Sequence, residues 1–227
     1  MACQSASMRI GVIGGTGPAG QAVAVQFAGI GIEVIVGSRS EERAAETVAA
    51  LTERWSGRPL PLVAGANAAA AQGDVVVVAT PWEGVLSTVE AVRDDLGDKL
   101  VVSMANALTR WGKHMVPLLP PTGSVTMAVA EALPDARVAG AFHHLPAGPW
   151  ADLDHRLDAD VMVCSAQRST TDELIGLIDR LPGLRGVDAG GLGSALALEA
   201  LTPAILEINR RYKTHASLRI NGLDELS

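Results

Sequence analysis

Ile10-Gly-Val-Ile-Gly-Gly-Thr-Gly-Pro-Ala-Gly20 is the stretch of the sequence that decides the fold. An apolar run ends in Gly15, Gly17 and Gly20, and a helical pattern rich in alanine and valine follows. This order predicts a strand, a tight turn and a helix start, in which Gly15 permits the turn, Gly17 lets phosphates approach and Gly20 lets the helix pack on the strand. The N–H groups of a first helical turn attract anions, so the stretch predicts a dinucleotide site, although spaced glycines also occur in turns that serve packing only.

The second predicted strand indicates which dinucleotide binds. It is the β-branched run Ile32-Glu-Val-Ile-Val36. Domains that select NAD usually end this strand, about 20 residues past the glycines, with an acidic residue for the ribose hydroxyl. This chain has Ser38 and Arg39 there, and Arg43 follows one helical turn later. A hydroxyl and two guanidinium groups suit a 2′-phosphate, so the pattern predicts NADP(H); a solvated arginine pair beside neighbouring glutamates is the alternative.

Apolar strand patterns alternate with helical patterns along the rest of the chain. Strands are predicted at 60–64, 74–80, 99–103, 137–142 (the sixth), 159–164 and within 182–191, and helices at 41–55, 66–72, 83–96, 124–133, 170–181 and 192–212, the last interrupted at Pro203. The alternation predicts the α/β class, with a Rossmann-type doubly wound parallel sheet and a smaller C-terminal α+β part. We expect a disordered extension at 1–7, an NADP-binding Rossmann domain at 8–147 and a smaller C-terminal domain at 148–227.

Composition excludes several classes of protein. The 227 residues are 48% hydrophobic and 19% charged, which is typical of a globular chain. The apolar stretches are too short for a bilayer, and the N-terminus lacks the pattern of a signal peptide, so we expect a cytoplasmic protein without a membrane partner. Only Cys3 and Cys164 are present, which predicts neither a disulfide framework nor a metal cluster. A formal net charge of -7 argues against nucleic acid as a partner.

The carboxyl ends of the predicted strands are where a doubly wound sheet binds its ligands. One strand runs into Thr80-Pro-Trp-Glu83, and Trp82 there either lies beside the cofactor or covers the sheet edge. The next strand ends in Ser103-Met-Ala-Asn106, which places small and flexible side chains where a nicotinamide would lie. Asn106 either hydrogen-bonds a carboxamide or ends the strand locally.

Two adjacent histidines follow the strand at 137–142. Consecutive side chains of an extended chain point in opposite directions, so His143 and His144 are poorly placed to share a metal ion. No cysteine or histidine at ligand spacing supports them. They either form a wall of the active site or pack in the core.

The segment from Asn209 to Arg219 carries four cations and no acid. The four are Arg210, Arg211, Lys213 and Arg219. In an acidic chain this excess indicates an anionic ligand, whereas a cationic helix end that meets its own dipole is the alternative.

The chain resembles the NADPH-dependent reductases of coenzyme F-420 (F420), also called F420:NADP oxidoreductases, over nearly its whole length after Met8. The matching stretches are Gly14-Gly-Thr-Gly-Pro-Ala-Gly20, Gly37-Ser-Arg39, Thr80-Pro-Trp-Glu83, His143-His-Leu-Pro-Ala147, Asp188-Ala-Gly190 and Leu201-Thr-Pro203. The first two fit several NADP families, and the later ones are more specific. Archaeal members have Thr in place of His144 and a shorter tail, so the resemblance assigns no role to His144.

The resemblance implies an oxidoreductase that transfers a hydride directly between the rings of NADP(H) and the 8-hydroxy-5-deazaflavin coenzyme F420. It implies a homodimer whose C-terminal domain completes the deazaflavin pocket, and no catalytic side chain or metal ion. The cofactor-binding residues that it implies are Gly15, Thr16, Gly17, Pro18, Ala19 and Gly20 for the pyrophosphate, Ser38, Arg39 and Arg43 for the 2′-phosphate, and Thr80, Pro81, Trp82, Leu86, Met104, Ala105, Asn106, His143, Leu145, Pro146, Ala147 and Leu218 around the rings.

Two other functions fit the same dinucleotide motif. One is an NADPH-dependent reductase of imines or small carbonyl compounds, for which the chain after residue 151 is short. The other is a regulator that senses NADP without catalysis and has no second cofactor pocket. The absence of a Ser–His–Asp or metal-ligand pattern agrees with hydride transfer, which depends on the orientation of two rings.

Overall fold

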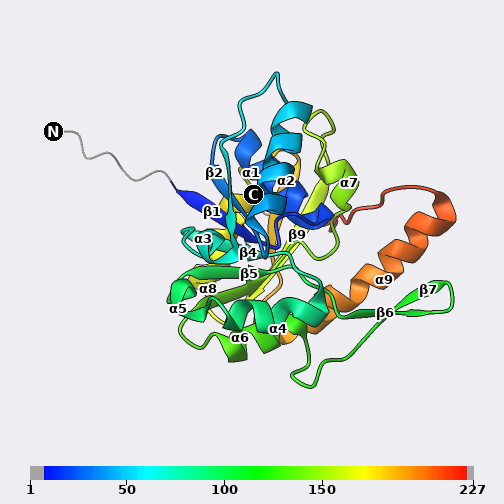
Figure 1. The fold of residues 1–227 in the computed structure, drawn as a ribbon. Coiled ribbons are helices and arrows are strands. Elements are labelled where there is room, and N and C mark those ends of the chain that lie inside the picture. Colours follow the sequence, from blue (N-terminus) through cyan, green and yellow to red (C-terminus); the bar gives the residue numbers. More distant parts are fainter. Residues whose placement is uncertain (1–7, 224–227) are drawn as a thin grey trace.

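An eight-stranded sheet forms the centre of the computed structural model, which describes residues 8–223 (Figure 1). The extension predicted at 1–7 lies outside these residues. The strands are β1 (Arg9–Ile13), β2 (Glu33–Ser38), β3 (Leu62–Ala66), β4 (Val75–Val78), β5 (Leu100–Ser103), β8 (Arg137–Gly140), β9 (Ala159–Ser165) and β10 (Leu184–Asp188).

The strand order is that of a dinucleotide-binding sheet with two strands added. Across the sheet it runs β10-β9-β8-β5-β4-β1-β2-β3. From β3 to β8 every pair is parallel, and this part has the order of the Rossmann fold. Strand β9 is antiparallel to β8 and parallel to β10. The predicted Rossmann-type α/β class is confirmed, and the C-terminal part extends the same sheet.

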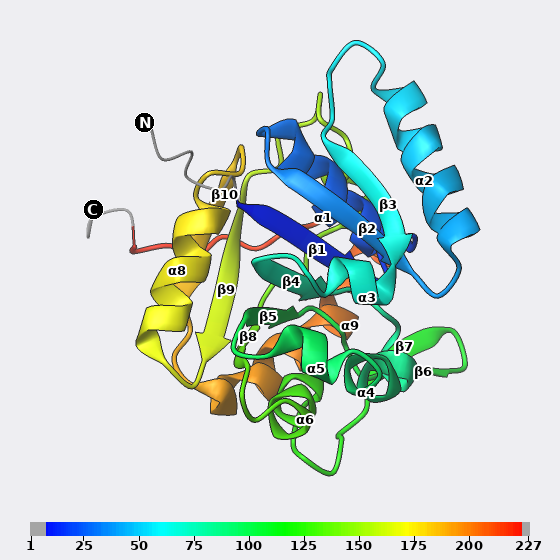
Figure 2. The ribbon, with the colours of Figure 1, turned by 60° about the vertical axis from the view of Figure 1, so that its left-hand side comes forward.

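Helices cover both faces of the sheet because the strands are apolar on both sides (Figure 2). In β4, Val75 and Val77 belong to one buried cluster, and Val76 and Val78 belong to the other. The first cluster includes residues of α1 (Pro18–Gly29), α7 (Ala147–Trp150) and α8 (Arg168–Ile178), and the second includes residues of α3 (Asn67–Ala70), α4 (Trp82–Glu90), α5 (Arg93–Leu96) and α6 (Val125–Ala132). Helix α2 (Glu41–Arg54) lies against β2 and β3.

The sequence analysis missed three elements, which are the two strands of a hairpin and the short helix α7. A hairpin of β6 (Leu108–Trp111) and β7 (His114–Pro117) follows β5, and Gly112 in its turn has a φ of 61°. The strand at 137–140 is therefore the eighth and not the sixth. The helix predicted at 83–96 is divided into α4 and α5, because the chain leaves the helical conformation at Val92, whose side chain is buried.

The predicted interruption at Pro203 is wrong. A short 3-10 turn (Leu192–Ser194) leads into α9 (Ala195–Tyr212), which continues through Pro203. A proline inside a helix removes one hydrogen bond, and here buried contacts of Glu199 and Thr202 fix the helix around it. No helix among residues 8–223, α9 included, is both long enough and apolar enough to cross a membrane.

Glu199 joins α9 to the first turn of α6. Its carboxylate accepts hydrogen bonds of 2.9 Å from the N–H groups of Val125 and Thr126 and from the Thr126 hydroxyl. The side chain is buried, and this burial raises the pKa of the Glu199 carboxyl against the opposing effect of the three hydrogen bonds. The carboxylate thus satisfies backbone donors that a helix start leaves free.

We expect Glu199→Ala to destabilise the fold by roughly 3 kcal/mol, because two buried N–H groups lose their acceptor. Urea unfolding followed by circular dichroism measures this change in the free energy of unfolding. Glu90→Ala, which removes an exposed carboxylate at the end of α4, is the control and should stay within about 0.5 kcal/mol of the parent. Equal effects of the two substitutions would show that Glu199 does not join the helices.

Candidate functional site

The turn after β1 is made by Gly14. Its φ is 73°, and a Cβ atom there would lie 2.7 Å from Cγ2 of Thr80. Gly15, to which the sequence analysis assigned the turn, has no positive φ; instead its N–H donates to the carbonyl of Gly37 at 2.8 Å. The assignment of the turn to Gly15 is therefore wrong, and Gly15 ties the loop to the end of β2.

The first turn of α1 has the features of an anion site. Gly17 is its N-cap, Pro18 is its first residue, and no side chain caps the turn. A Cβ atom on Gly20 would lie 2.7 Å from the carbonyl oxygen of Gly14, whereas one on Gly17 would meet nothing closer than 3.7 Å. Packing therefore requires Gly20, and Gly17 leaves open space before uncapped N–H groups. These residues fit a dinucleotide pyrophosphate.

Asn67, which the sequence analysis missed, contacts the glycine loop from the start of α3. It begins α3 directly after β3, and its Oδ1 accepts a hydrogen bond from the N–H of Gly14 at 3.3 Å. A polar side chain directly after a strand was the available signal. Asn67 thereby holds the glycine turn from the neighbouring strand.

Ser38, Arg39 and Arg43 lie around the turn between β2 and α2. Ser38 is buried, and its Oγ accepts a hydrogen bond from the N–H of Ser40. Ser40 caps α2 by accepting from the N–H of Arg43 at 3.2 Å. Both arginine side chains are exposed and have no carboxylate partner among residues 8–223, which leaves the guanidinium groups available for an anion.

Trp82 is held at the start of α4 by the β6–β7 hairpin. Its Nε1 donates to the carbonyl oxygen of Leu108 at 3.1 Å, and the residue is half-buried. Leu86, one helical turn further, is 41% exposed. Of the neighbouring residues in the predicted set, Thr80 packs against Gly14, Pro81 caps α4, and Met104 and Ala105 are buried. Trp82 and Leu86 therefore present apolar surface after β4.

Asn106 and Thr202 bind one carbonyl group, that of His143. The Nδ2 group of Asn106 donates to this oxygen at 3.0 Å, and the hydroxyl of Thr202 lies 3.0 Å from it and 3.1 Å from Oδ1 of Asn106. This geometry gives Asn106 a local structural role, one of the two that the sequence allowed. Thr202 lies in one of the stretches that carried the resemblance, but the sequence assigned it no role. Together the two residues join α9 to the ends of β5 and β8.

Phe142 has an unusual backbone conformation just after β8. Its φ is 65°, a left-handed conformation that costs a non-glycine residue energy and persists only where the surroundings enforce it. The Phe142 ring stacks on the Trp150 ring with centroids 5.4 Å apart. Leu145, Pro146 and Ala147, which follow the end of β8, are partly exposed.

His143 and His144 point into the protein. His143 is 4% exposed, and neither ring nitrogen has a hydrogen-bond partner among the described residues. Burial, and then the neighbouring His144, lower the pKa of His143 to about 3. The ring of His144 lies 2.9 Å through Nε2 from the carbonyl oxygen of Asp160, and burial lowers its pKa. Both rings are therefore neutral near pH 7, and His143 packs in the interior.

The C-terminal segment returns to the carboxyl edge. The N–H of Asp160 donates to the carbonyl oxygen of Leu218 at 2.7 Å, and the carbonyl oxygen of Asp160 lies close to the ring of His144, so Leu218 and His144 contact the same residue of β9. Two cations of the basic segment are engaged inside the chain: Arg210 pairs with Glu207 at 2.7 Å, and Arg219 pairs with Asp158 at 2.9 Å. Arg211 and Lys213 are exposed and have no carboxylate partner among residues 8–223.

The carboxyl ends of β1, β2, β4, β5 and β8 thus gather most of the predicted residues. Surface hollows lie elsewhere, one of about 220 Å³ beside α5 and one of about 200 Å³ at the start of α8. Neither of these two hollows is lined by a residue of the predicted set. Among residues 8–223 no three His, Cys, Asp or Glu side chains lie close enough to hold a metal ion.

Comparison with known proteins gives consistent matches. The family described as NADP oxidoreductase, coenzyme F420-dependent, matches residues 9–107. The F420-dependent NADP reductase of Methanocaldococcus jannaschii is 33% identical over 223 residues, which span 96% of this chain and 100% of that protein. A crystal structure from Arthrobacter sp. FB24, provisionally described as an F420-dependent NADP reductase, has a TM-score of 0.80 at 25% identity and covers 94% of this chain and 99% of that one.

More distant structures share the fold. An imine reductase from Bacillus cereus BAG3X2 has a TM-score of 0.63 at 18% identity; the match covers 91% of this chain and 63% of that protein. At this identity the likeness concerns the fold alone.

We expect Arg39→Ala to weaken NADPH binding about ten- to a hundredfold and to leave NADH binding almost unchanged. A charge-assisted bidentate contact is typically worth about 1.5 to 3 kcal/mol, and NADH lacks the 2′-phosphate. Fluorescence titration of each nucleotide measures both dissociation constants. Arg58→Ala, which removes an exposed arginine elsewhere, is the control. An equal loss for the two nucleotides would contradict the assignment.

Proposed function

We propose that this chain, which belongs to the family of F420-dependent NADP reductases, transfers a hydride between NADP(H) and the 8-hydroxy-5-deazaflavin coenzyme F420. The observation that carries the proposal is the similarity to the Methanocaldococcus jannaschii reductase, which spans 96% of this chain and 100% of that protein. The test is to mix the protein with NADPH and oxidised F420 and to follow the visible absorbance of the deazaflavin. Bleaching that needs both the protein and NADPH is expected, and unchanged absorbance would contradict the proposal.

We propose that the two parts of the chain bind different cofactors. Residues 8–147 hold NADP(H): the uncapped first turn of α1 faces the pyrophosphate, and Arg39 and Arg43 grip the 2′-phosphate. Residues 148–227 complete the deazaflavin pocket, in which Leu218 contacts the second cofactor. The support for this division is the return of the C-terminal segment to the carboxyl edge of the sheet.

The chain positions two rings and performs no proton chemistry of its own. When both cofactors are bound, their rings supply the reaction, a direct hydride transfer from one ring to the other. Trp82, Leu86 and the strip from Leu145 to Ala147 offer apolar surface that orients the rings and excludes water. Orientation of this kind lowers the barrier to hydride transfer, because the entropic cost of bringing the two rings together is met when the cofactors bind and not in the transition state.

The reaction needs no histidine as an acid or base. His143 and His144 are buried and neutral, with pKa values below the ordinary range. They shape the loop that carries the strip, and they have no proton to give near neutral pH.

His143→Asn should therefore keep the maximal rate within about tenfold of the parent, because a lost general acid typically costs about a hundred- to ten-thousandfold. We also expect a flat rate between pH 6 and 9. The pKa of His143 is near 3 in the folded protein, so the imidazole binds no proton in this window. Stopped-flow measurement of F420 reduction tests both points. A rate loss above a hundredfold with unchanged cofactor binding would show that His143 is an acid.

Two alternatives have less support. An imine or carbonyl reductase shares the fold at low identity, and no feature of the described residues favours that substrate. An NADP-sensing regulator needs no second cofactor site, whereas this chain presents a partly exposed apolar strip after β8 and exposed cations at the end of α9. Reduction of F420 in the assay above excludes a regulator, and turnover of a cyclic imine without F420 would favour the first alternative.

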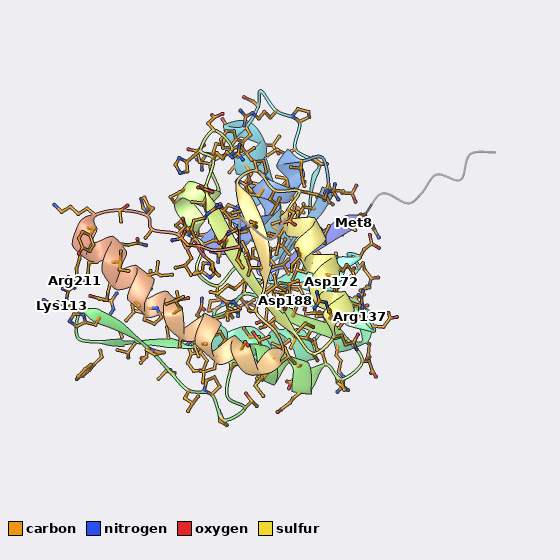
Figure 3. The ribbon with its side chains drawn as sticks, turned by 180° about the vertical axis from the view of Figure 1, so that it is seen from behind. Met8, Lys113, Arg137, Asp172, Asp188 and Arg211 are labelled. Atoms are coloured by element: carbon orange, nitrogen blue, oxygen red, sulfur yellow. The ribbon has the colours of Figure 1, made fainter. Side chains whose placement is uncertain are left out.

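Exposed cations lie at the end of α9 and in the β6–β7 turn. His114 of β7 lies 3.1 Å through Nδ1 from the Glu207 carboxylate, which brings the hairpin turn beside the end of α9. Lys113 precedes this histidine, and Arg211 lies one helical turn beyond Glu207; Figure 3 shows both at the same end of the molecule. We propose that Arg211 and Lys213 attract the phosphate and carboxylates of the F420 side chain.

Replacing Arg211 and Lys213 together by Ala should raise the Michaelis constant for F420 several-fold and leave that for NADPH within about twofold. Exposed charge contacts contribute about 1 kcal/mol or less, so the effect should shrink as salt is added. Steady-state kinetics at two ionic strengths provides the measurement. Arg168→Ala, an exposed cation of α8, is the control. A lower melting temperature with unchanged constants would show that the cations act on the fold alone.

We also propose a homodimer. The hairpin, its flank and the end of α9 expose large side chains, with Trp111 and Tyr212 76% and Leu119 70% exposed. Grouped exposed apolar side chains are typical of protein contacts. Sedimentation velocity is the test, and a species of 23.4 kDa at micromolar concentration would contradict the dimer. The cytoplasmic location stays a prediction from the sequence, which cell fractionation would test.

A further inference from the structure

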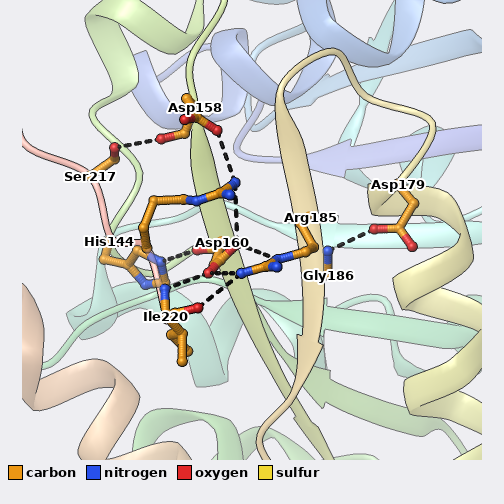
Figure 4. A network of polar contacts seen from close by, with 9 residues as sticks. His144, Asp158, Asp160, Asp179, Arg185, Gly186, Ser217 and Ile220 are labelled. Atoms are coloured by element: carbon orange, nitrogen blue, oxygen red, sulfur yellow. Dashed lines mark hydrogen bonds and ion pairs between the residues drawn. The ribbon is translucent and has the colours of Figure 1, made fainter. Parts of the chain in front are cut away.

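Asp160 is a fully buried carboxylate at the start of β9. The guanidinium group of Arg185, on β10, binds it in bidentate fashion with two contacts of 2.7 Å. The N–H of Ile220 donates to Oδ2 of the same carboxylate at 2.6 Å. Arg219 adds a longer ion contact of 3.8 Å. One buried charge thus joins the last two strands of the sheet to the C-terminal segment (Figure 4).

The main chain of Asp160 also contacts two segments that are distant in the sequence. Its N–H donates to the carbonyl oxygen of Leu218, and its carbonyl oxygen lies 2.9 Å from Nε2 of His144. Because β9 is antiparallel to β8, the start of β9 lies on the side of the sheet where β8 ends. Asp160 therefore connects the segment after β8, which carries the predicted strip, with the segment around Leu218.

We call residues 217–220 the strap. Besides its two bonds to Asp160, the strap is held by the hydroxyl of Ser217, which donates to the carbonyl oxygen of Asp158 at 3.1 Å. Arg219 pairs with the Asp158 carboxylate, and the carbonyl oxygen of Ile220 accepts from Arg185 at 3.1 Å. The strap belongs to no helix or strand, so these contacts and not a ladder of backbone bonds determine its position.

The charge on Asp160 persists in this buried site. Burial raises the pKa of the Asp160 carboxyl, but the hydrogen bonds from Arg185 and Ile220 and the charges of Arg185 and Arg219 outweigh burial and hold it below its ordinary value. A buried ion pair adds little net stability compared with apolar packing, whereas removing one partner leaves an uncompensated charge. Such a pair therefore serves to fix one arrangement of the chain more than to stabilise the fold.

We propose that Asp160 is a positioning residue for the second cofactor, because it anchors the strap at the carboxyl edge and so places Leu218 against the deazaflavin. This inference rests on the proposed function. It assigns a role to a residue that contacts neither cofactor: Asp160 acts through the strap, and Arg185 and Arg219 complete its anchor. The proposed NADP(H) residues follow other strands, β1 and β2.

The experiment compares Asp160→Asn with the parent chain by two measurements. Hydrogen–deuterium exchange of the peptide covering residues 214–223 reports the anchoring, and we expect exchange at least about tenfold faster in the variant. Steady-state kinetics reports the positioning. The Michaelis constant for F420 should rise about three- to tenfold, because the fraction of molecules with the strap in place falls, and that for NADPH should stay within about twofold.

Two further variants make the result decisive. Arg219→Ala removes an exposed partner and leaves the buried pair intact, so it should raise the Michaelis constant for F420 by about two- to threefold even if Asp160→Asn does not fold. Arg137→Ala is the control: it removes an arginine at the start of β8 that pairs with Glu173 of α8, and it should change neither measurement.

Each other outcome overturns the proposal. Faster exchange of the strap with an unchanged constant for F420 would show that the strap does not position the cofactor. Equal rises for F420 and NADPH would show a general loss of structure. A parent chain that does not reduce F420 contradicts the proposed function itself, whereas an active parent with insensitive variants overturns only the role of Asp160.

Discussion

The register of the parallel strands is the constraint on which the candidate site depends. Parallel strands from β3 to β8 end on one edge of the sheet, and the residues that follow each strand are therefore brought together. Between β1 and β4 the chain changes direction across the sheet, and the glycine turn lies there. The turn is held by Gly37 from β2 and by Asn67 after β3, so neighbouring strands fix a loop that has little side-chain packing of its own.

Buried polar groups then attach the C-terminal part to this edge. Glu199 binds the first turn of α6, Thr202 binds the carbonyl group of His143, and Asp160 binds the strap. Each interaction joins segments far apart in the sequence, and each satisfies donors or acceptors that burial would otherwise leave unpaired. These contacts support the course of α9 through Pro203, because Glu199 and Thr202, which precede the proline, hold the helix where one backbone hydrogen bond is missing.

Local patterns in the sequence predicted the parts of the fold that are decided locally. The glycine loop, the valine run of β4 and the alternation of strands and helices follow from short-range spacing, and they gave the correct class. The turn at Gly14 and the part played by Thr202 were missed, because they depend on contacts between distant segments, with Thr80 and with His143. The β6–β7 hairpin is a local element that was also missed, and its strands are only four residues long and partly or fully exposed. The predicted cofactor residues lie around one edge, but His143 faces the interior, which spacing along one strand does not reveal.

The basic segment shows how tertiary partners change the meaning of a charge pattern. In the sequence four cations stand together without an acid, yet Arg210 and Arg219 find carboxylates on Glu207 and Asp158. The segment therefore has fewer unpaired cations than the sequence indicates. Among residues 8–223, Arg211 and Lys213 are the two cations of the segment without a carboxylate partner. One arginine of the segment, Arg219, therefore helps to hold the strap, while Arg211 and Lys213 are the cations that we propose to attract an anion. Anchoring and attraction are separate properties of the same segment, because one depends on buried geometry and the other on exposed charge.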